Sequence, residues 1–86
     1  MALFERVQEV IARELSLPES MVTEKASFYG DLQADSLSAI ELFAAIEDEF
    51  DINLPEEDYQ EMRTVGDVVR YIEKQLAERE GAPVLP

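Results

Sequence analysis

The stretch that decides the fold is DLQADSLSAIEL, residues 31–42, in which a loop leads into an amphipathic helix. Asp35 and Ser36 are both good helix N-cap residues, because a short side-chain oxygen can accept a hydrogen bond from the free N–H groups of the first turn. Either residue could be the cap. Such a pair alone usually marks only a helix start, so a functional role for Ser36 depends on the pattern that follows it.

The helix predicted for residues 36–50 has two apolar stripes when its residues are placed at 100° intervals. One stripe is typical of a helix that faces a core, and it consists of Ala39, Leu42, Phe43, Ile46 and Phe50. Roughly opposite lies a smaller strip of Leu37, Ile40 and Ala44, flanked by Glu41, Glu47 and Asp48. An apolar strip with an acidic rim favours docking of a partner with a basic rim. Scattered exposed apolar residues are also normal, and the pattern alone leaves both interpretations open.

Composition excludes several classes of function. With 86 residues, the chain forms one small domain with a limited core. It contains no cysteine and no histidine, which removes disulfides, the usual zinc ligands, the Ser-His triad and the commonest general base. The absence of cysteine is also compatible with a reducing compartment. We therefore do not expect a self-sufficient hydrolase.

The charge is strongly acidic. The 20 acidic and 7 basic residues give a net charge of −13, which disfavours nucleic acid and anionic membranes and favours basic partners. Residues 26–62 contain eleven carboxylates and no lysine or arginine. This run lacks the glycine and the regular oxygen spacing of an EF-hand, so no dedicated metal site is predicted. With no membrane-spanning run and no signal-peptide pattern, we expect a cytoplasmic monomer that does not insert stably into membranes.

Three further helices are expected around the central one. Residues 2–15 carry an apolar arc of Leu3, Phe4, Val7, Val10, Ile11 and Leu15, with Ala12 on the solvent side. Pro55 and the acidic residues after it predict a short helix at residues 55–61. Thr64 and Asp67 resemble a capping box before a final helix, whose buried stripe is Val65, Val68, Val69, Ile72 and Leu76.

Residues 16–35 lack a helical period and form a long connection, with a short helical turn expected near residues 18–21. Long connections are usually functional or packed by their own side chains, here Leu17, Met21, Val22, Phe28 and Leu32. The fold class is therefore all-α: a small bundle of three principal helices plus a short helix, with a long ordered loop between helices one and two. Residues 1–80 form this domain, and residues 81–86 form a flexible tail.

The chain resembles the acyl carrier proteins of fatty-acid and polyketide synthesis over residues 7–75. The resemblance rests on LQADSL at residues 32–37, EL at 41–42, EDEF at 47–50, TVGD at 64–67 and YI at 71–72. It implies a non-catalytic carrier in which Ser36 carries a 4'-phosphopantetheine group through a phosphodiester, with acyl chains held as thioesters on its thiol. It also implies that partner enzymes grip a surface made of Asp35, Leu37, Ile40, Glu41, Ala44, Glu47 and Asp48.

The partners implied are a phosphopantetheinyl transferase and the acyl-transferring and chain-elongating enzymes, which would present basic docking patches. The chain departs from the family pattern at Gln33, where glycine is usual, and at Ser38, where an acidic residue is common. An acidic helical interaction module without a prosthetic group, in which Ser36 is only a cap, remains the alternative. The sequence does not identify the acyl cargo. A freestanding carrier is a simpler expectation than an excised piece of a larger synthase.

Overall fold

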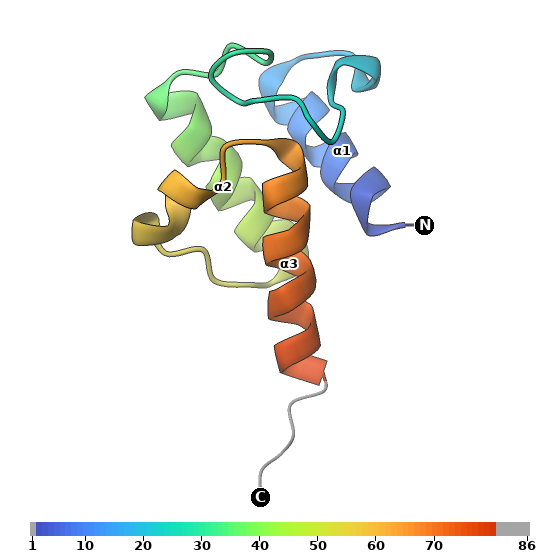
Figure 1. The fold of residues 1–86 in the computed structure, drawn as a ribbon, viewed down its shortest axis with the longest axis vertical. Helices are drawn as coiled ribbons and strands as arrows, with labels where there is room; N and C mark the ends of the chain where they lie inside the picture. Colours follow the sequence, from blue (N-terminus) through green and yellow to red (C-terminus); the bar gives the residue numbers. More distant parts are fainter. Residues whose placement is uncertain (1, 81–86) are drawn as a thin grey trace, which may run out of the picture.

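The computed structural model describes residues 2–80. They form three α-helices, α1 (Leu3–Leu15), α2 (Ser36–Phe50) and α3 (Val65–Glu80), with two short 3-10 helices, η1 (Glu19–Met21) and η2 (Glu56–Glu61). Figure 1 shows the long connection between α1 and α2 crossing one end of the bundle. The predicted all-α fold class, with three principal helices and a long ordered loop, is confirmed. The tail predicted at residues 81–86 lies outside the described residues.

The core lies between the three α-helices. All five residues predicted for the inner stripe of α2 are buried, and α1 contributes Val7, Val10 and Ile11 as predicted. Ala12, which the sequence analysis placed on the solvent side, is also buried, so that assignment was wrong. The Leu17 N–H donates to the Ala12 carbonyl at 2.9 Å, and this contact folds the chain after α1 back toward Ala12.

The connection between α1 and α2 is ordered and packed by its own side chains. Val22, Phe28 and Leu32 are buried as predicted, whereas Met21 is 43% exposed and that prediction was wrong. The Gln8 side-chain amide of α1 donates to the carbonyls of Glu19 and Val22, each at 3.0 Å. These bonds fasten η1 to α1 through its backbone, so Val22 is buried beside the helix while Met21 points outward.

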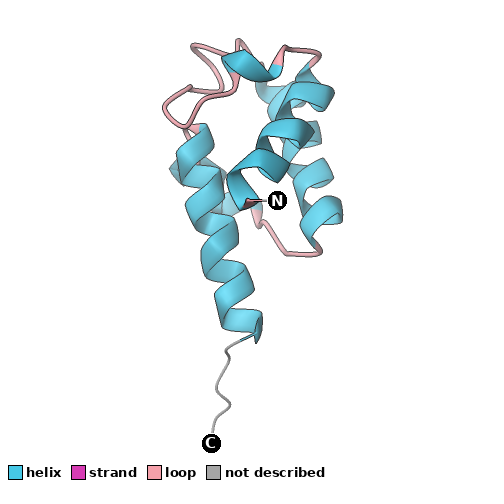
Figure 2. Ribbon diagram, turned by 90° about the vertical axis from the view of Figure 1, so that its right-hand side faces the viewer, coloured by secondary structure: helices cyan, strands magenta, loops and turns pink. Residues whose placement is uncertain are grey.

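The end of the connection is tied to the start of α3. The Phe28 N–H donates to the Arg63 carbonyl at 3.0 Å, and the Val65 N–H donates to the Ala26 carbonyl at 3.0 Å. Figure 2 shows these loops gathered at one end of the bundle, while α3 extends beyond its neighbours at the other end. Within residues 2–80, no helix combines the length and apolar character needed to cross a membrane.

The start of α3 has the predicted capping box. The Asp67 N–H donates to Thr64 Oγ1 at 3.2 Å, and the Thr64 N–H donates to Asp67 Oδ2 at 3.1 Å. Val65, Val68 and Ile72 are fully buried, and Val69 and Leu76 are partly buried at the edge of the stripe. The reciprocal pair fixes where α3 begins, which in turn positions the loop bonded to it.

The short helix predicted at residues 55–61 is a 3-10 helix, η2, with Pro55 just before its first residue. Six residues are too few to nucleate a stable α-helix alone, and 3-10 geometry is common in such short connectors. Two side-chain hydrogen bonds hold this segment: the Leu54 N–H donates to Glu47 Oε2 at 2.7 Å, and the Tyr71 hydroxyl donates to Asp58 Oδ2 at 2.9 Å. They fasten η2 to both α2 and α3.

Candidate functional site

The change from loop to helix at α2 is made by Asp35. Its backbone is extended, with φ −97° and ψ −177°, and its Oδ1 accepts a hydrogen bond from the Ser38 N–H at 2.8 Å. This bond satisfies one of the free N–H groups at the helix start. Of the two N-cap candidates in the sequence, the cap is therefore Asp35.

The Asp35 carboxylate carries a stable negative charge. The hydrogen bonds that Ser38 donates, from its backbone and then from its side chain, hold the pKa of Asp35 below its ordinary value. A negative charge is favourable at this place, because the N-terminus of a helix carries a partial positive charge. Asp35 is thus ionised at neutral pH.

Ser36 is the first residue of α2, and it is exposed. Because Asp35 is the cap, the Ser36 hydroxyl forms no hydrogen bond with any residue in the described part of the chain. It lies at the positive end of the helix dipole, where an attached anionic group such as a phosphate is favoured. The hydroxyl is therefore accessible and has no structural contact to lose when it is modified.

Gln33 adopts a left-handed backbone, with φ 56°. A residue with a Cβ is strained in this region, whereas glycine is not. This left-handed conformation is the one expected here, because the family that the sequence resembles usually has glycine at this position. The turn before Ser36 is thus kept, and the glutamine holds it at a cost in backbone strain.

Replacing Gln33 by glycine should stabilise the protein by about 1 kcal/mol. Left-handed strain in a non-glycine residue is of order 1–3 kcal/mol, and the larger conformational entropy of unfolded glycine offsets about 0.4–1 kcal/mol of the gain. The Gln33 side chain is exposed, so little packing is lost. Urea denaturation of Gln33→Gly and Gln33→Ala measures the effect. Alanine keeps the strain, and equal stability of the two variants would contradict this account.

The outward side of α2 carries the second, smaller apolar strip that is expected from the sequence. Leu37 is 64% exposed and Ile40 is 45% exposed, and Ala44 is also exposed beside them. Glu41 and Asp48 are exposed on the same helix. We call Leu37, Ile40, Ala44, Glu41 and Asp48 the outer face of α2.

Glu47 differs from the other carboxylates of α2. It is half-buried, and its Oε2 accepts the hydrogen bond from the Leu54 N–H. This contact fixes the chain between α2 and η2. The sequence pattern grouped Glu47 with the acidic rim, and the structure adds a local role for its carboxylate in positioning that connection.

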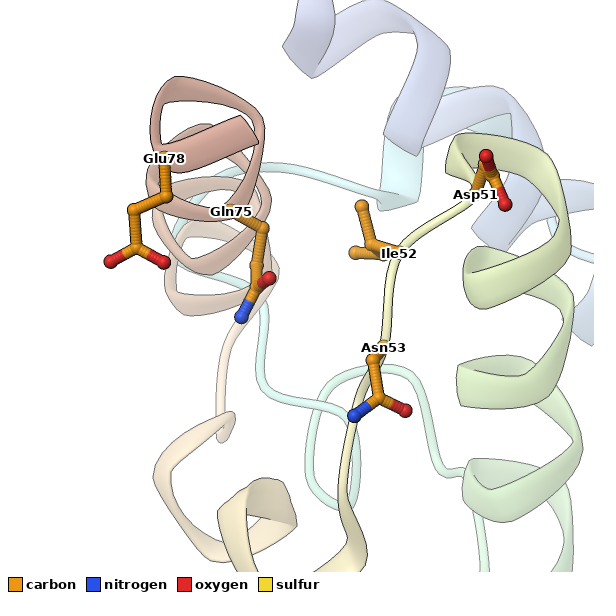
Figure 3. Close-up of a pocket in the computed structure, with 5 residues that line it drawn as sticks. All are labelled: Asp51, Ile52, Asn53, Gln75 and Glu78. Carbon is orange, nitrogen blue, oxygen red and sulfur yellow. The ribbon is translucent and has the colours of Figure 1, made fainter. Parts of the chain in front are cut away.

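A surface hollow at the opposite end of α2 is lined by Asp51, Ile52, Asn53, Gln75 and Glu78 (Figure 3). At a rise of 1.5 Å per residue, Asp51 lies about 22 Å from Ser36 along the helix. In Figure 3 the Gln75 and Glu78 side chains come from α3, and Gln75 lies on the side nearer to the segment after α2. This hollow is separate from the Ser36 site.

The similarity to known proteins covers most of the chain. A family model described as "Phosphopantetheine attachment site" matches residues 5–72. The acyl carrier proteins of Helicobacter pylori strains J99 and G27 are 49% and 48% identical to this chain over 73 residues, which are 85% of this chain and 94% of each relative. The chain belongs to the acyl carrier protein family.

A solved structure agrees with this acyl carrier protein assignment. The acyl carrier protein from Enterococcus faecalis is 32% identical and matches with a TM-score of 0.71, over 85% of this chain and 92% of that chain. The chain is thus a non-catalytic carrier of fatty-acid biosynthesis that bears a phosphopantetheine arm. Its identity implies interaction with a phosphopantetheinyl transferase and with fatty-acid synthesis enzymes.

The Ser36 site of this acyl carrier protein fits a phosphodiester-linked arm. Ser36 lies inside the matched residues 5–72, is exposed, and starts a helix whose dipole favours phosphate. The alternative of an interaction module in which Ser36 is only a cap loses its basis, because Asp35 is the cap.

The sequence analysis did not single out Tyr59, whose ring contacts Phe43 at a centroid distance of 4.5 Å. Its one sequence signal was an aromatic residue within an acidic helical turn.

Proposed function

We propose that Ser36 Oγ is the attachment atom of the 4'-phosphopantetheine arm, and that this protein presents acyl groups carried on the arm to its partner enzymes. When bound, the arm supplies a thiol that holds acyl groups as thioesters. The observation that carries the assignment is the exposed Ser36 hydroxyl, which has no hydrogen-bond partner among residues 2–80, next to a cap made by Asp35. The domain of residues 1–80 would act as a cytoplasmic monomer.

Mass spectrometry tests the attachment. The unmodified protein is incubated with coenzyme A and a phosphopantetheinyl transferase, and the product is digested and sequenced by fragmentation. Ser36 Oγ should lose its proton and bond to the phosphorus atom next to the pantetheine of coenzyme A, while the pyrophosphate P–O bond breaks and adenosine 3',5'-bisphosphate leaves. The mass increase should map to the peptide that contains Ser36. An unchanged mass with several active transferases, or a modification on another residue, contradicts the proposal.

We further propose that the outer face of α2, together with Asp35, docks basic partner enzymes. The support is an exposed apolar strip of Leu37, Ile40 and Ala44 next to the carboxylates of Glu41 and Asp48. Apolar contacts supply burial in such an interface, and the charged rim supplies steering and register. Glu47 belongs to the edge of this surface, where its carboxylate also fixes the following loop.

Reversing charge at Glu41 or Asp48 to lysine should slow association with the transferase several-fold and change the dissociation rate less. Charges at a rim act mainly on the encounter rate. Salt should have the same effect, since the Debye length falls from about 10 Å at 0.1 M to about 3 Å at 1 M. Stopped-flow measurements of the association rate, with each variant and over this range of salt, check both effects.

The matched control is Glu9→Lys, which makes the same change in net charge at an exposed position of α1. This variant should associate nearly as fast as the parent. Equal slowing by Glu9→Lys would show that only the total charge matters. Association rates that change with neither salt nor charge reversal would show that the carboxylates of the outer face are only solvated and do not steer partners.

A further inference from the structure

The hollow of Figure 3 lies where the last turns of α3 pass the segment that follows α2. Its volume is about 530 Å³, within the roughly 300–1,000 Å³ typical of sites that hold a small ligand. We call it the distal hollow, because about 22 Å along α2 separates it from Ser36. The proposed attachment of the arm to Ser36 makes no use of it.

One wall of the distal hollow is fixed by Glu47. The Glu47 carbonyl accepts a hydrogen bond from the Ile52 N–H at 3.2 Å, and Glu47 Oε2 accepts one from the Leu54 N–H at 2.7 Å. Asp51 ends α2 in the left-handed conformation, and its N–H also donates to the Glu47 carbonyl. The segment at residues 51–54 is therefore held in place before anything binds to it.

The distal hollow has apolar surface that is only partly covered. Ile52 lines the hollow, and Leu76 follows Gln75 of its lining. Both apolar side chains pack against the core and are half-buried. In Figure 3 the Ile52 side chain points from its own segment toward α3, and Figure 2 shows α3 continuing beyond its neighbours at this end. Residues 2–80 thus leave this apolar surface partly open to water.

Residues 81–86, GAPVLP, have a composition that suits such a surface. They carry no charge, although the chain has 20 acidic and 7 basic residues. Val84 and Leu85 supply apolar side chains, whose burial is favourable. A neutral segment also approaches Asp51 and Glu78 without like-charge repulsion. The 81–86 segment therefore matches the distal hollow in both apolar character and charge.

The 81–86 segment begins close to the distal hollow. Glu78, which lines the hollow, is two residues before the end of α3. Six residues extend up to about 20 Å, whereas α3 rises only about 7.5 Å from Gln75 to its end. Glycine directly after a helix, with proline soon after it, is typical of a helix that ends in a left-handed residue. Gly81 and Pro83 occupy these positions, so the segment has both the length and the sequence needed to turn back.

We propose that the 81–86 segment folds back from the end of α3 and binds the distal hollow, where Val84 and Leu85 cover Ile52. The segment forms a strap between α3 and the connection after α2, in place of the flexible tail expected from the sequence. Tethering gives an effective concentration of order millimolar, so a weak affinity keeps the strap closed. A second copy of the chain is a poorer occupant, because two molecules of net charge −13 repel each other.

Paramagnetic broadening in backbone NMR spectra tests the position of the segment. The chain has no cysteine, so Pro86→Cys gives a nitroxide label a single attachment point. The label should strongly broaden the N–H signals of Ile52 and Asn53. It should leave those of Tyr29 and Gly30, in the loops at the other end of the bundle, unchanged. Unbroadened signals of Ile52 and Asn53 would overturn the proposal.

The matched control carries Val84→Ser and Leu85→Ser together with the same label. Serine keeps the length and the neutral charge of the segment and removes its apolar side chains. The broadening at Ile52 and Asn53 should then fall several-fold, while that at Glu78 changes less, because Glu78 is close to the label in sequence. Equal broadening with and without the two serines would show that nearness in sequence alone brings the label to the hollow, and would contradict the proposal.

Two further measurements separate the strap from contacts between molecules and from any effect of the label. In the unsubstituted protein, the methyl groups of Leu85 and Ile52 should give NOEs, and their absence would contradict the proposal. Isotope-labelled parent protein is also mixed with unlabelled chains that carry the nitroxide. Broadening of the parent's Ile52 signal in this mixture would show docking between two copies and overturn the strap. All samples are unmodified at Ser36, so failure of the strap and failure of the attachment are separate results.

Discussion

Ser36→Ala should remain folded and lose all ability to accept the phosphopantetheine arm. Alanine has no oxygen to bond to the phosphorus atom, so no arm can attach at position 36. The fold should be nearly unaffected, because the Ser36 hydroxyl makes no hydrogen bond among the described residues. Alanine is also the best helix former. Intact mass after incubation with coenzyme A and a transferase measures loading, and urea denaturation measures stability.

Two neighbouring variants act as controls for Ser36→Ala. Ser38→Ala loses the same hydroxyl group two residues later and should still be loaded. Asp35→Ala loses the N-cap and should be less stable by about 0.5–2 kcal/mol. If Ser36→Ala were as destabilised as Asp35→Ala, Ser36 would have a structural role that the hydrogen bonds do not show. If Ser36→Ala still gained the arm, the attachment residue would be another one.

The helices were largely predictable because their signals are local. The predicted bounds of α2, residues 36–50, are those of the structure. Capping residues precede that helix, and Asp51 at its end adopts the left-handed conformation with φ 54°. The buried stripe of α2 follows from the spacing of apolar residues along one helix. The same spacing predicted which residues of α2 are exposed.

The connections were less predictable because their burial depends on distant partners. Met21 and Val22 are adjacent apolar residues, and only Val22 is buried. Gln8, from a helix more than ten residues earlier, donates to the carbonyls of Glu19 and Val22 and so holds this segment against α1. Tyr59 contacts a ring sixteen positions earlier in the chain, and Phe43 links it to Phe28. No periodicity in either segment indicates such contacts. The ring contacts of Tyr59 therefore could not be predicted from the sequence.

The backbone conformation of Gln33 is indicated by the family resemblance and not by a local sequence pattern. No local rule assigns a left-handed backbone to glutamine, and the residue alone predicts nothing unusual. The family resemblance marked its position as one where glycine is common. The structure gives the reason, because the backbone there has φ 56°. The turn before Ser36 is thus a property of the fold that this sequence maintains against the preference of its own residue.

Phe43→Ala should destabilise the unloaded protein by about 3–5 kcal/mol, the range for removing a buried phenylalanine ring. Phe43 is 3% exposed and contacts two other rings, so the variant loses both apolar burial and aromatic packing. Single small domains have roughly 5–15 kcal/mol of stability, so the loss should lower the urea midpoint strongly. Phe43→Leu leaves a smaller cavity and should give an intermediate value.

The control for Phe43→Ala is Ile40→Ala, three residues earlier on the same helix. Ile40 is 45% exposed on the outer face, and alanine favours the helix more than isoleucine does. Its replacement should therefore change stability little. Similar losses of stability in Phe43→Ala and Ile40→Ala would contradict the conclusion that α2 has one buried and one exposed side.

A tethered acyl chain should restore part of the stability that Phe43→Leu or Phe43→Ala loses. In the parent, the Phe43 ring fills its place in the core and contacts the rings of Phe28 and Tyr59. Removing the Phe43 ring opens a space on the Ser36 side of α2, and a longer chain can fill more of that space. Any group that binds only the native state raises its stability. Melting temperatures of the forms with short and long chains should therefore differ more in the Phe43 variants than in the parent or in Ile40→Ala. An equal dependence on chain length in all of them would show that Phe43 does not stand between the chain and the core.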